Sequence, residues 1–126
     1  MAKIILYIDD HRLSLLVIQE FFNDTEYQIV ISQESDKWQD LMVAHQPDIL
    51  LLDLDMPVSG EYIAEQVRLV DKTIPMVAYS AKHVAYVDVL RAIGFNGLIT
   101  KIKDKASFLD VFTRILGDED IWETIF

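Results

Sequence analysis

The sequence predicts an α/β fold, a doubly wound five-stranded parallel sheet with helices on both faces. Short apolar runs alternate with segments of helical periodicity, and this strand-then-helix pattern repeats five times within 126 residues. Residues 49–52 are four consecutive large aliphatic side chains between turn residues, which is typical of a strand buried on both faces. Short connections between such units favour parallel strands and right-handed crossovers.

The local signals define ten elements and several of their ends. Five short apolar runs predict strands at 3–8, 27–32, 48–52, 76–79 and 97–100. Apolar residues three and four apart predict helices at 12–23, 35–45, 61–70, 84–93 and 104–116. Pro47 stops the second helix, Gly94 is expected as the C-terminal cap of the fourth, Asp104 as the N-cap of the last, and Gly117 as its end.

The helices differ in how much apolar surface they offer. The expected inner faces are Trp38, Leu41 and Met42 on the second helix and Ile63, Val67 and Val70 on the third, while the fourth is apolar nearly all round. The first helix has two stripes, one with Leu13, Leu16, Val17 and Phe21 and one with Leu15, Ile18 and Phe22. The second stripe is a candidate docking face for a helical partner, with coverage by neighbouring helices as the alternative.

Composition and charge limit the classes of function. A hydrophobic fraction of 52% excludes disorder, and no apolar run approaches the ~18 residues of a membrane span. The chain has no cysteine and no signal-peptide layout, so we expect a cytoplasmic protein without disulfides. A net charge of −10 argues against direct binding of nucleic acid or anionic membranes and suits a cation or a basic partner.

Polar residues stand at four strand ends: Asp9 and Asp10, Asp53, Ser80, and Lys101. Because parallel strands point the same way, these residues can converge at one edge of the sheet. Taken singly, each is an ordinary turn, cap or surface residue. Three converging carboxylates raise one another's pKa values, however, so they require a counter-charge. A divalent cation and the Lys101 ammonium are the available ones.

Such an arrangement suits phosphoryl transfer. Mg²⁺, or Mn²⁺ in its place, prefers oxygen ligands, which Asp10, Asp53 and the backbone carbonyl of Asp55 can supply, with Asp9 acting through a water. A carboxylate is a competent nucleophile toward phosphorus, and we expect Asp53 in that role. Lys101 and Ser80 are expected to contact the phosphoryl oxygens. His11 lies beside the acidic pair and either touches the site or only begins the first helix.

The sequence resembles the receiver domain of bacterial response regulators, the CheY-like family, over residues 3–116. The resemblance rests on Asp9-Asp10, Asp53 with Met56-Pro57, Gly60, Ser80-Ala81 and Lys101. It implies a flavodoxin-like sheet of order 2-1-3-4-5 and phosphorylation of Asp53 by a sensor histidine kinase or phosphotransfer protein. It also implies a switch role for the Ser80 hydroxyl, an output protein that the sequence does not name, and no enzymatic activity beyond the domain's own phosphorylation and dephosphorylation.

Two positions depart from the family pattern, and two others are variable. Leu98 occupies the switch position where the family usually has an aromatic residue, and Ile102 replaces the usual proline after the lysine, so a trans bond is expected there. The resemblance suggests that Asp55 and Lys82 tune the rate at which water removes the phosphoryl group. We expect the two side chains to pair across the mouth of the site.

Residues 117–126 form an acidic and apolar tail beyond the receiver domain, which is assigned to residues 1–116. The apolar edge of the tail consists of Ile121, Trp122, Ile125 and Phe126. We expect it to pack on its own domain or on another subunit rather than to begin a linker, because exposed Trp and Phe are a liability. A homodimer through the tail, or through the face formed by 84–93, 97–100 and 104–116, is a further expectation.

Two alternative functions remain open at this stage. A degenerate receiver, acting as an interaction module without phosphorylation, is favoured by Leu98 and Ile102. A phosphohydrolase with Asp53 as nucleophile and Asp55 as general acid is suggested by the Asp-x-Asp motif, which resembles the haloacid dehalogenase signature. That family places the motif after the first strand and carries cap insertions, whereas here the motif follows the third strand and no cap is present.

Overall fold

The computed structural model describes residues 2–82, 84–101 and 103–124, and its five parallel strands form one sheet of order β2-β1-β3-β4-β5. The strands are β1 (Ile4–Ile8), β2 (Gln28–Ser32), β3 (Ile49–Asp53), β4 (Met76–Ser80) and β5 (Gly97–Thr100). The helices are α1 (Arg12–Phe21), the 3₁₀ turn η1 (Ser35–Lys37), α2 (Trp38–His45), α3 (Gly60–Val70), α4 (Val87–Ile93) and α5 (Lys105–Leu116). The predicted fold class is confirmed.

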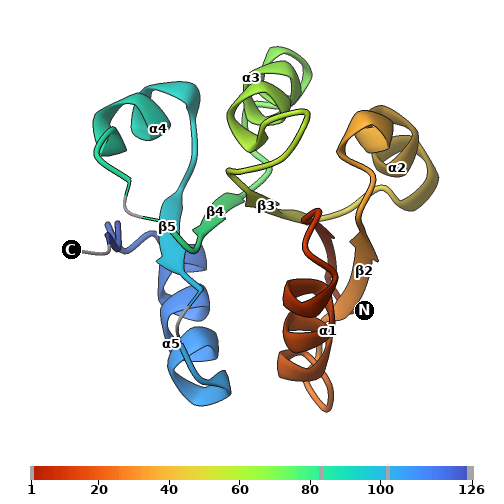
Figure 1. The fold of residues 1–126 in the computed structure, drawn as a ribbon, viewed down its shortest axis with the longest axis vertical. Coiled ribbons are helices and arrows are strands. Elements are labelled where there is room, and N and C mark those ends of the chain that lie inside the picture. The colour runs from red at the N-terminus through yellow and green to blue at the C-terminus, as the bar shows by residue number, and fades with distance from the viewer. Residues whose placement is uncertain (1, 83, 102, 125–126) are drawn as a thin grey trace.

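The helices cover both faces of the sheet and divide the core into two layers. Figure 1 shows α1 and α5 on one face and α2, α3 and α4 on the other. Alternate residues of each strand point to opposite layers: Leu50 and Leu52 pack toward α3, whereas Ile49 and Leu51 pack toward α1 and α5. This two-sided burial explains why the central strand is a continuous apolar run.

Most expected elements are present, with local differences at their ends. The predicted helix at 35–45 starts with the separate turn η1, and the one at 84–93 begins only at Val87, although Val84 is buried beside it. Asp104 caps α5 by accepting a hydrogen bond from the Ser107 N–H, and Gly94 ends α4 at a positive φ of 116°, both as predicted.

Val70, predicted on an inner face, is 87% exposed. Helical periodicity gives the direction of its side chain but not whether another element covers the last turn.

The prediction of a docking face at Leu15, Ile18 and Phe22 is wrong. All three side chains are buried, and the Phe22 ring contacts Phe112 of α5 with 5.3 Å between ring centroids. In the other stripe, Leu13, Leu16 and Val17 are exposed, with Leu13 at 77%, whereas Phe21 packs against Phe108 of α5. Both stripes are apolar, so periodicity alone does not distinguish the side that the sheet and α5 cover.

The tail folds back along the outer edge of β5. The Leu98 N–H donates to the carbonyl of Ile121 over 3.1 Å, and the Glu123 N–H donates to the carbonyl of Leu98 over 2.9 Å. This pairing forms an isolated parallel bridge between Leu98 and Trp122, and the Trp122 side chain packs against the core layer of α3 and α4. The tail therefore packs on its own chain, as expected; Ile125 and Phe126, predicted in its apolar edge, lie outside the described residues.

Among the described helices, none has the length and hydropathy of a membrane span.

Gly60, the first residue of α3, is required by a close backbone approach. A Cβ at Gly60 would lie 2.4 Å from the backbone carbonyl oxygen of Asp53, which cannot move without shifting the end of β3. We expect Gly60→Ala to lower the free energy of unfolding by about 1–3 kcal/mol, measured by urea denaturation.

Gly117→Ala is the matched control, because a Cβ there makes only ordinary contacts of 3.4 Å or more and its φ is −86°. It should change stability by less than about 0.5 kcal/mol. Equal losses in the two variants would contradict the steric explanation.

Candidate functional site

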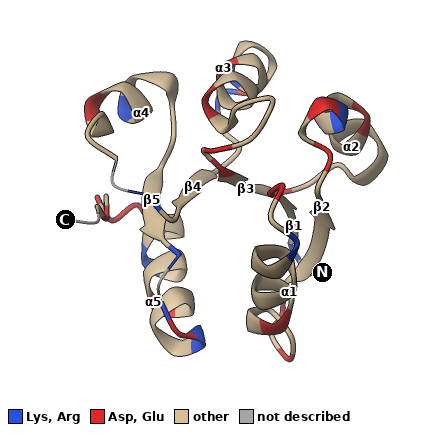
Figure 2. Cartoon of the chain, viewed as in Figure 1, with Lys and Arg blue, Asp and Glu red and all other residues tan. Residues whose placement is uncertain are grey.

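Charged side chains at the ends of three strands lie close together at the carboxyl edge of the sheet. Asp9 directly follows β1, Asp53 ends β3, and Lys101 directly follows β5. The Lys101 Nζ lies 2.5 Å from Asp9 Oδ2 and 3.3 Å from Asp53 Oδ1. Figure 2 shows acidic segments at the ends of β1 and β3, close together near the middle of the sheet. The predicted convergence of these residues is therefore present.

Asp9 is completely buried and bound from several sides. Its Oδ2 accepts hydrogen bonds from Lys101 and from the Tyr7 hydroxyl, and its Oδ1 accepts the His11 N–H over 2.9 Å. Burial by itself raises the pKa of Asp9, but the hydrogen bonds from Lys101, Tyr7 and the His11 backbone outweigh it and hold the pKa below its ordinary value. Asp9 is therefore a buried carboxylate that holds Lys101 in place.

Two buried tyrosines support this pair, and sequence reasoning missed both. Tyr7 donates to Asp9, and the Tyr79 ring of β4 lies 5.4 Å from the Lys101 Nζ, a cation–π distance. Burial is the main cause of the raised pKa of each phenol. In an apolar run, a tyrosine is interpreted as an ordinary core residue, because its hydroxyl group gives no sign of a partner. Because side chains alternate along a strand, the spacing of two between Tyr7 and Asp9 was the signal available.

Asp53 is buried as well, but it is far less well compensated. Its Oδ1 lies near Lys101, whereas its buried Oδ2 has no hydrogen-bond partner among the described residues. Burial, followed by repulsion from the Asp9 carboxylate, raises the pKa of Asp53 to about 7, although Lys101 opposes the shift. The site therefore contains a carboxylate whose ionised form requires further positive charge.

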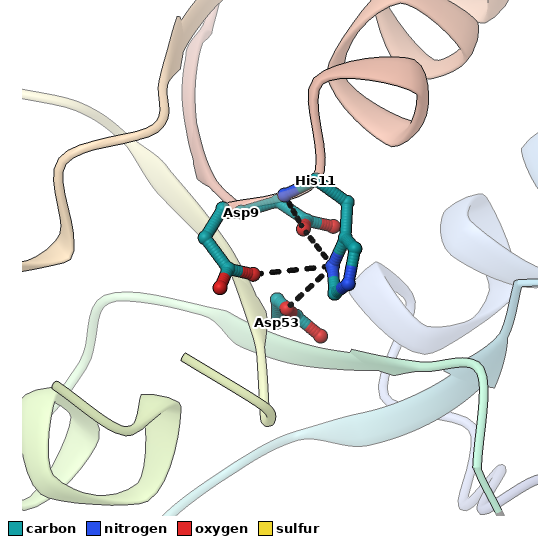
Figure 3. Close-up of side chains that lie close together, drawn as sticks. Asp9, His11 and Asp53 are labelled. Carbon is teal, nitrogen blue, oxygen red and sulfur yellow. Dashed lines mark hydrogen bonds and ion pairs between the residues drawn. The ribbon is translucent and has the colours of Figure 1, made fainter. Parts of the chain in front are cut away.

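His11 touches the site and also stands at the N-cap of α1. Its Nδ1 lies 3.2 Å from Asp9 Oδ1, 3.1 Å from Asp10 Oδ1 and 3.8 Å from Asp53 Oδ2. Figure 3 shows the imidazole ring beside the Asp9 and Asp53 side chains. The ring is more than half exposed, at 59%, so it lies over the mouth of the site rather than inside it. His11 therefore touches the site in addition to preceding the first helix.

The cluster suits a hard divalent cation. One ligand atom each from Asp9, Asp10, His11 and Asp53 lies within 4.8 Å of the others. Carboxylate oxygens are the ligands that Mg²⁺ prefers, and the unpartnered Oδ2 of Asp53 is a buried acceptor of the kind such an ion would satisfy. The residues present therefore fit a magnesium site.

The loops after β3 and β4 are joined by the ion pair expected from the sequence. The Lys82 Nζ lies 2.7 Å from Asp55 Oδ2, and this pairing lowers the pKa of Asp55 and raises that of Lys82. The Ser80 hydroxyl accepts the Lys82 N–H and donates to the Lys82 carbonyl, both over 3.1 Å. Within the described residues, no hydrogen bond joins Ser80 to the acidic cluster.

The two departures from the family pattern have different outcomes. Leu98 is buried and forms a backbone bridge with Trp122, whose aromatic side chain packs against the same core layer. The expected trans bond before Ile102 lies outside the described residues.

Comparison with known proteins identifies the family. The chain matches the family model of the response regulator receiver domain over residues 5–113. It belongs to this family. The receiver domain is 24% identical to the polar-differentiation response regulator DivK of Brucella anthropi over 122 residues, which cover 94% of this chain and 99% of DivK.

Solved structures show the same fold. The chemotaxis response regulator CheY4 of Vibrio cholerae superposes with a TM-score of 0.82 at 18% identity, covering 91% of this receiver domain and 99% of CheY4. The BeF₃-activated receiver domain of RstA from Klebsiella pneumoniae superposes with a TM-score of 0.80 at 19% identity, covering 90% and 97% of the two chains. The strand order expected from the family resemblance is confirmed.

The raised pKa of Asp53 predicts a pH-dependent cost to stability. A carboxyl group that ionises near pH 7 in the folded chain, but near 3.8 when unfolded, lowers the free energy of unfolding as pH rises between those values. Asp53→Asn removes this loss, so its stability relative to the unaltered chain should rise from pH 4 to pH 7.5 by on the order of 3 kcal/mol.

The measurement is urea denaturation in the presence of a chelator, so that no metal compensates the charge. Asp40→Asn, at an exposed position of α2, is the control and should show no such gain. A stability difference for Asp53→Asn that does not change with pH would contradict the assignment.

Proposed function

We propose that this receiver domain accepts a phosphoryl group on Asp53 from a sensor histidine kinase or a phosphotransfer protein in a Mg²⁺-dependent reaction. Phosphorylation then switches binding to an output protein within a two-component pathway in the cytoplasm. The observation that carries the proposal is the Asp53 carboxylate, which is buried beside Lys101 and leaves one oxygen without a partner.

The reaction assigns a role to each residue of the cluster. An Asp53 oxygen forms a bond to phosphorus as the bond from phosphorus to the donor's imidazole nitrogen breaks, and that nitrogen keeps the electron pair. The Lys101 ammonium, 3.3 Å from Asp53, stabilises negative charge on the phosphoryl oxygens. Asp9 keeps Lys101 oriented toward this position through its own contact with the ammonium.

A bound Mg²⁺ or Mn²⁺ would supply the further positive charge that the acidic cluster requires. Asp10, Asp53 and the Asp55 carbonyl would hold it. The oxygens of Asp9 already accept hydrogen bonds from Lys101, Tyr7 and His11, which suits an indirect contact through a water. The same ion would favour ionisation of Asp53, whose pKa is raised without it.

The switch would operate through Ser80. Its hydroxyl is bonded to the backbone of Lys82 in its own loop, and we propose that it turns to a phosphoryl oxygen when Asp53 is phosphorylated. Breaking the two bonds to Lys82 would release the loop between β4 and α4. This loop leads to the face formed by α4, β5 and α5, where a homodimer or output contact would include the tail.

A small-molecule phosphodonor separates this function from its alternatives. Incubation with phosphoramidate and Mg²⁺ should add one phosphoryl group to the chain, detected by intact-mass spectrometry, and Asp53→Asn should abolish the addition. Chelation of the metal should also prevent it, because the carboxylate cluster is then left uncompensated.

Absence of the adduct in the unaltered chain would instead favour an interaction module that works without phosphorylation. Rapid multiple turnover of the donor would favour a phosphohydrolase.

The ion pair between Asp55 and Lys82 should shield the phosphoryl group from water. Asp55→Ala and Lys82→Ala should each shorten the lifetime of the phosphorylated form by about two- to fivefold, in keeping with the modest energy of an exposed ion pair. The decay is followed by intact mass after removal of the donor.

Asp110→Ala is the control, because it breaks an exposed pair with Arg114, at a 3.5 Å separation, within α5. Lifetimes that are the same in all three variants would refute the shielding role.

A further inference from the structure

The tail supplies hydrogen-bonding groups to the strand that carries Lys101. The outer edge of β5 pairs with the tail at Leu98, as described above. Further along the same edge, the Thr100 N–H donates to the side-chain Oε1 of Glu123 over 3.1 Å. Glu123 therefore binds the residue that directly precedes Lys101.

Glu123 also binds on the other side of the lysine. Its Oε2 lies 2.8 Å from the Lys103 Nζ, and the two side chains are only 21% and 23% exposed. A partly buried pair is screened less by solvent than an exposed one. The neighbouring tail residue Glu119 differs, because its pair with Arg114 is about half exposed and does not involve β5.

The Glu123 carboxylate is held in position by the packing of the tail. The preceding residue, Trp122, packs against the core layer that contains Leu98, and the Arg91 guanidinium of α4 lies 5.0 Å above its ring. Arg91 also pairs with Asp120 over 3.0 Å. Since the backbone of Glu123 is itself bonded to Leu98, its side chain has little freedom to leave Thr100.

We propose that Glu123 is a positioning residue for Lys101. By binding the residues at positions 100 and 103, its carboxylate fixes the segment from which the lysine reaches Asp9 and Asp53. The Lys101 N–H is bonded to the Ser80 carbonyl on the opposite side, so the segment is held between β4 and the tail. The kinetic consequence rests on the proposed phosphorylation of Asp53, whereas the positioning itself does not.

Three variants test the proposal. Glu123→Ala removes both contacts, Glu123→Gln keeps an oxygen that accepts the Thr100 N–H, and Glu119→Ala removes an ion pair from the same tail without touching β5. The maximal phosphorylation rate with phosphoramidate should fall roughly tenfold in Glu123→Ala, because a displaced charge stabilises the transferred group poorly. Glu123→Gln should recover most of this loss, and Glu119→Ala should match the unaltered chain.

Two further measurements separate positioning from general damage. The dissociation constant for Mg²⁺, measured by calorimetry, should change less than about twofold in Glu123→Ala, since Asp10 and Asp53 are untouched. Amide hydrogen exchange at Thr100 and Lys101 should quicken in Glu123→Ala but not in Glu119→Ala. A parallel loss of phosphorylation rate and Mg²⁺ affinity would overturn the proposal, as would unchanged exchange at Lys101.

The exchange measurement does not depend on phosphorylation. If the unaltered chain takes up no phosphoryl group while exchange at Lys101 quickens in Glu123→Ala, the proposed function fails and the positioning role stands. If the unaltered chain is phosphorylated and Glu123→Ala behaves as Glu119→Ala does, the positioning role fails and the function stands.

Discussion

Repulsion between buried carboxylates is the constraint on which the rest of the site depends. Asp9 and Asp53 lie buried at the ends of adjacent strands, and among the described residues Lys101 is the only lysine or arginine that pairs with both. Burial raises the pKa of both groups. At Asp9 the hydrogen bonds from Lys101, Tyr7 and the His11 backbone outweigh it, whereas at Asp53 repulsion from Asp9 adds to it, so the two pKa values shift in opposite directions. Asp53 is therefore the carboxylate of the two whose ionised form requires further positive charge.

The topology of the sheet makes this arrangement possible. All five strands are parallel, so residues that are 92 positions apart in the sequence, Asp9 and Lys101, meet at the same edge. β5 lies at the outside of the sheet, with no further strand beyond it to fix its position. The tail fills part of that role, and it links the strand that carries the lysine to the surface formed by α4 and α5.

Much of the fold and of the site could be predicted, and most of what was missed depends on contacts between elements. Apolar runs and turn residues located every strand, and the polar residues at the strand ends located Asp9, Asp53 and Lys101. Whether the Leu15, Ile18 and Phe22 stripe of α1 is a docking face or is covered stayed open, because both stripes are apolar and periodicity does not show which side meets α5; the structure shows that it is covered. Tyr79 was missed because its contact with Lys101 depends on the placement of β4 beside β5, whereas Tyr7 was missed although its spacing of two from Asp9 is a local signal.

The sequence by itself determined which residues could carry charge at the edge of the sheet, since strand polarity and spacing are local properties. It also indicated the family, because residue type and position agree at four of the five strand ends. The tertiary structure alone decided how far hydrogen bonds and positive charge stabilise each of the two carboxylates. Burial and neighbouring dipoles set the difference between Asp9 and Asp53, and the long-range contact of Glu123 with Thr100 joins the tail to the lysine segment. Both depend on distances across the sheet, which no stretch of sequence contains.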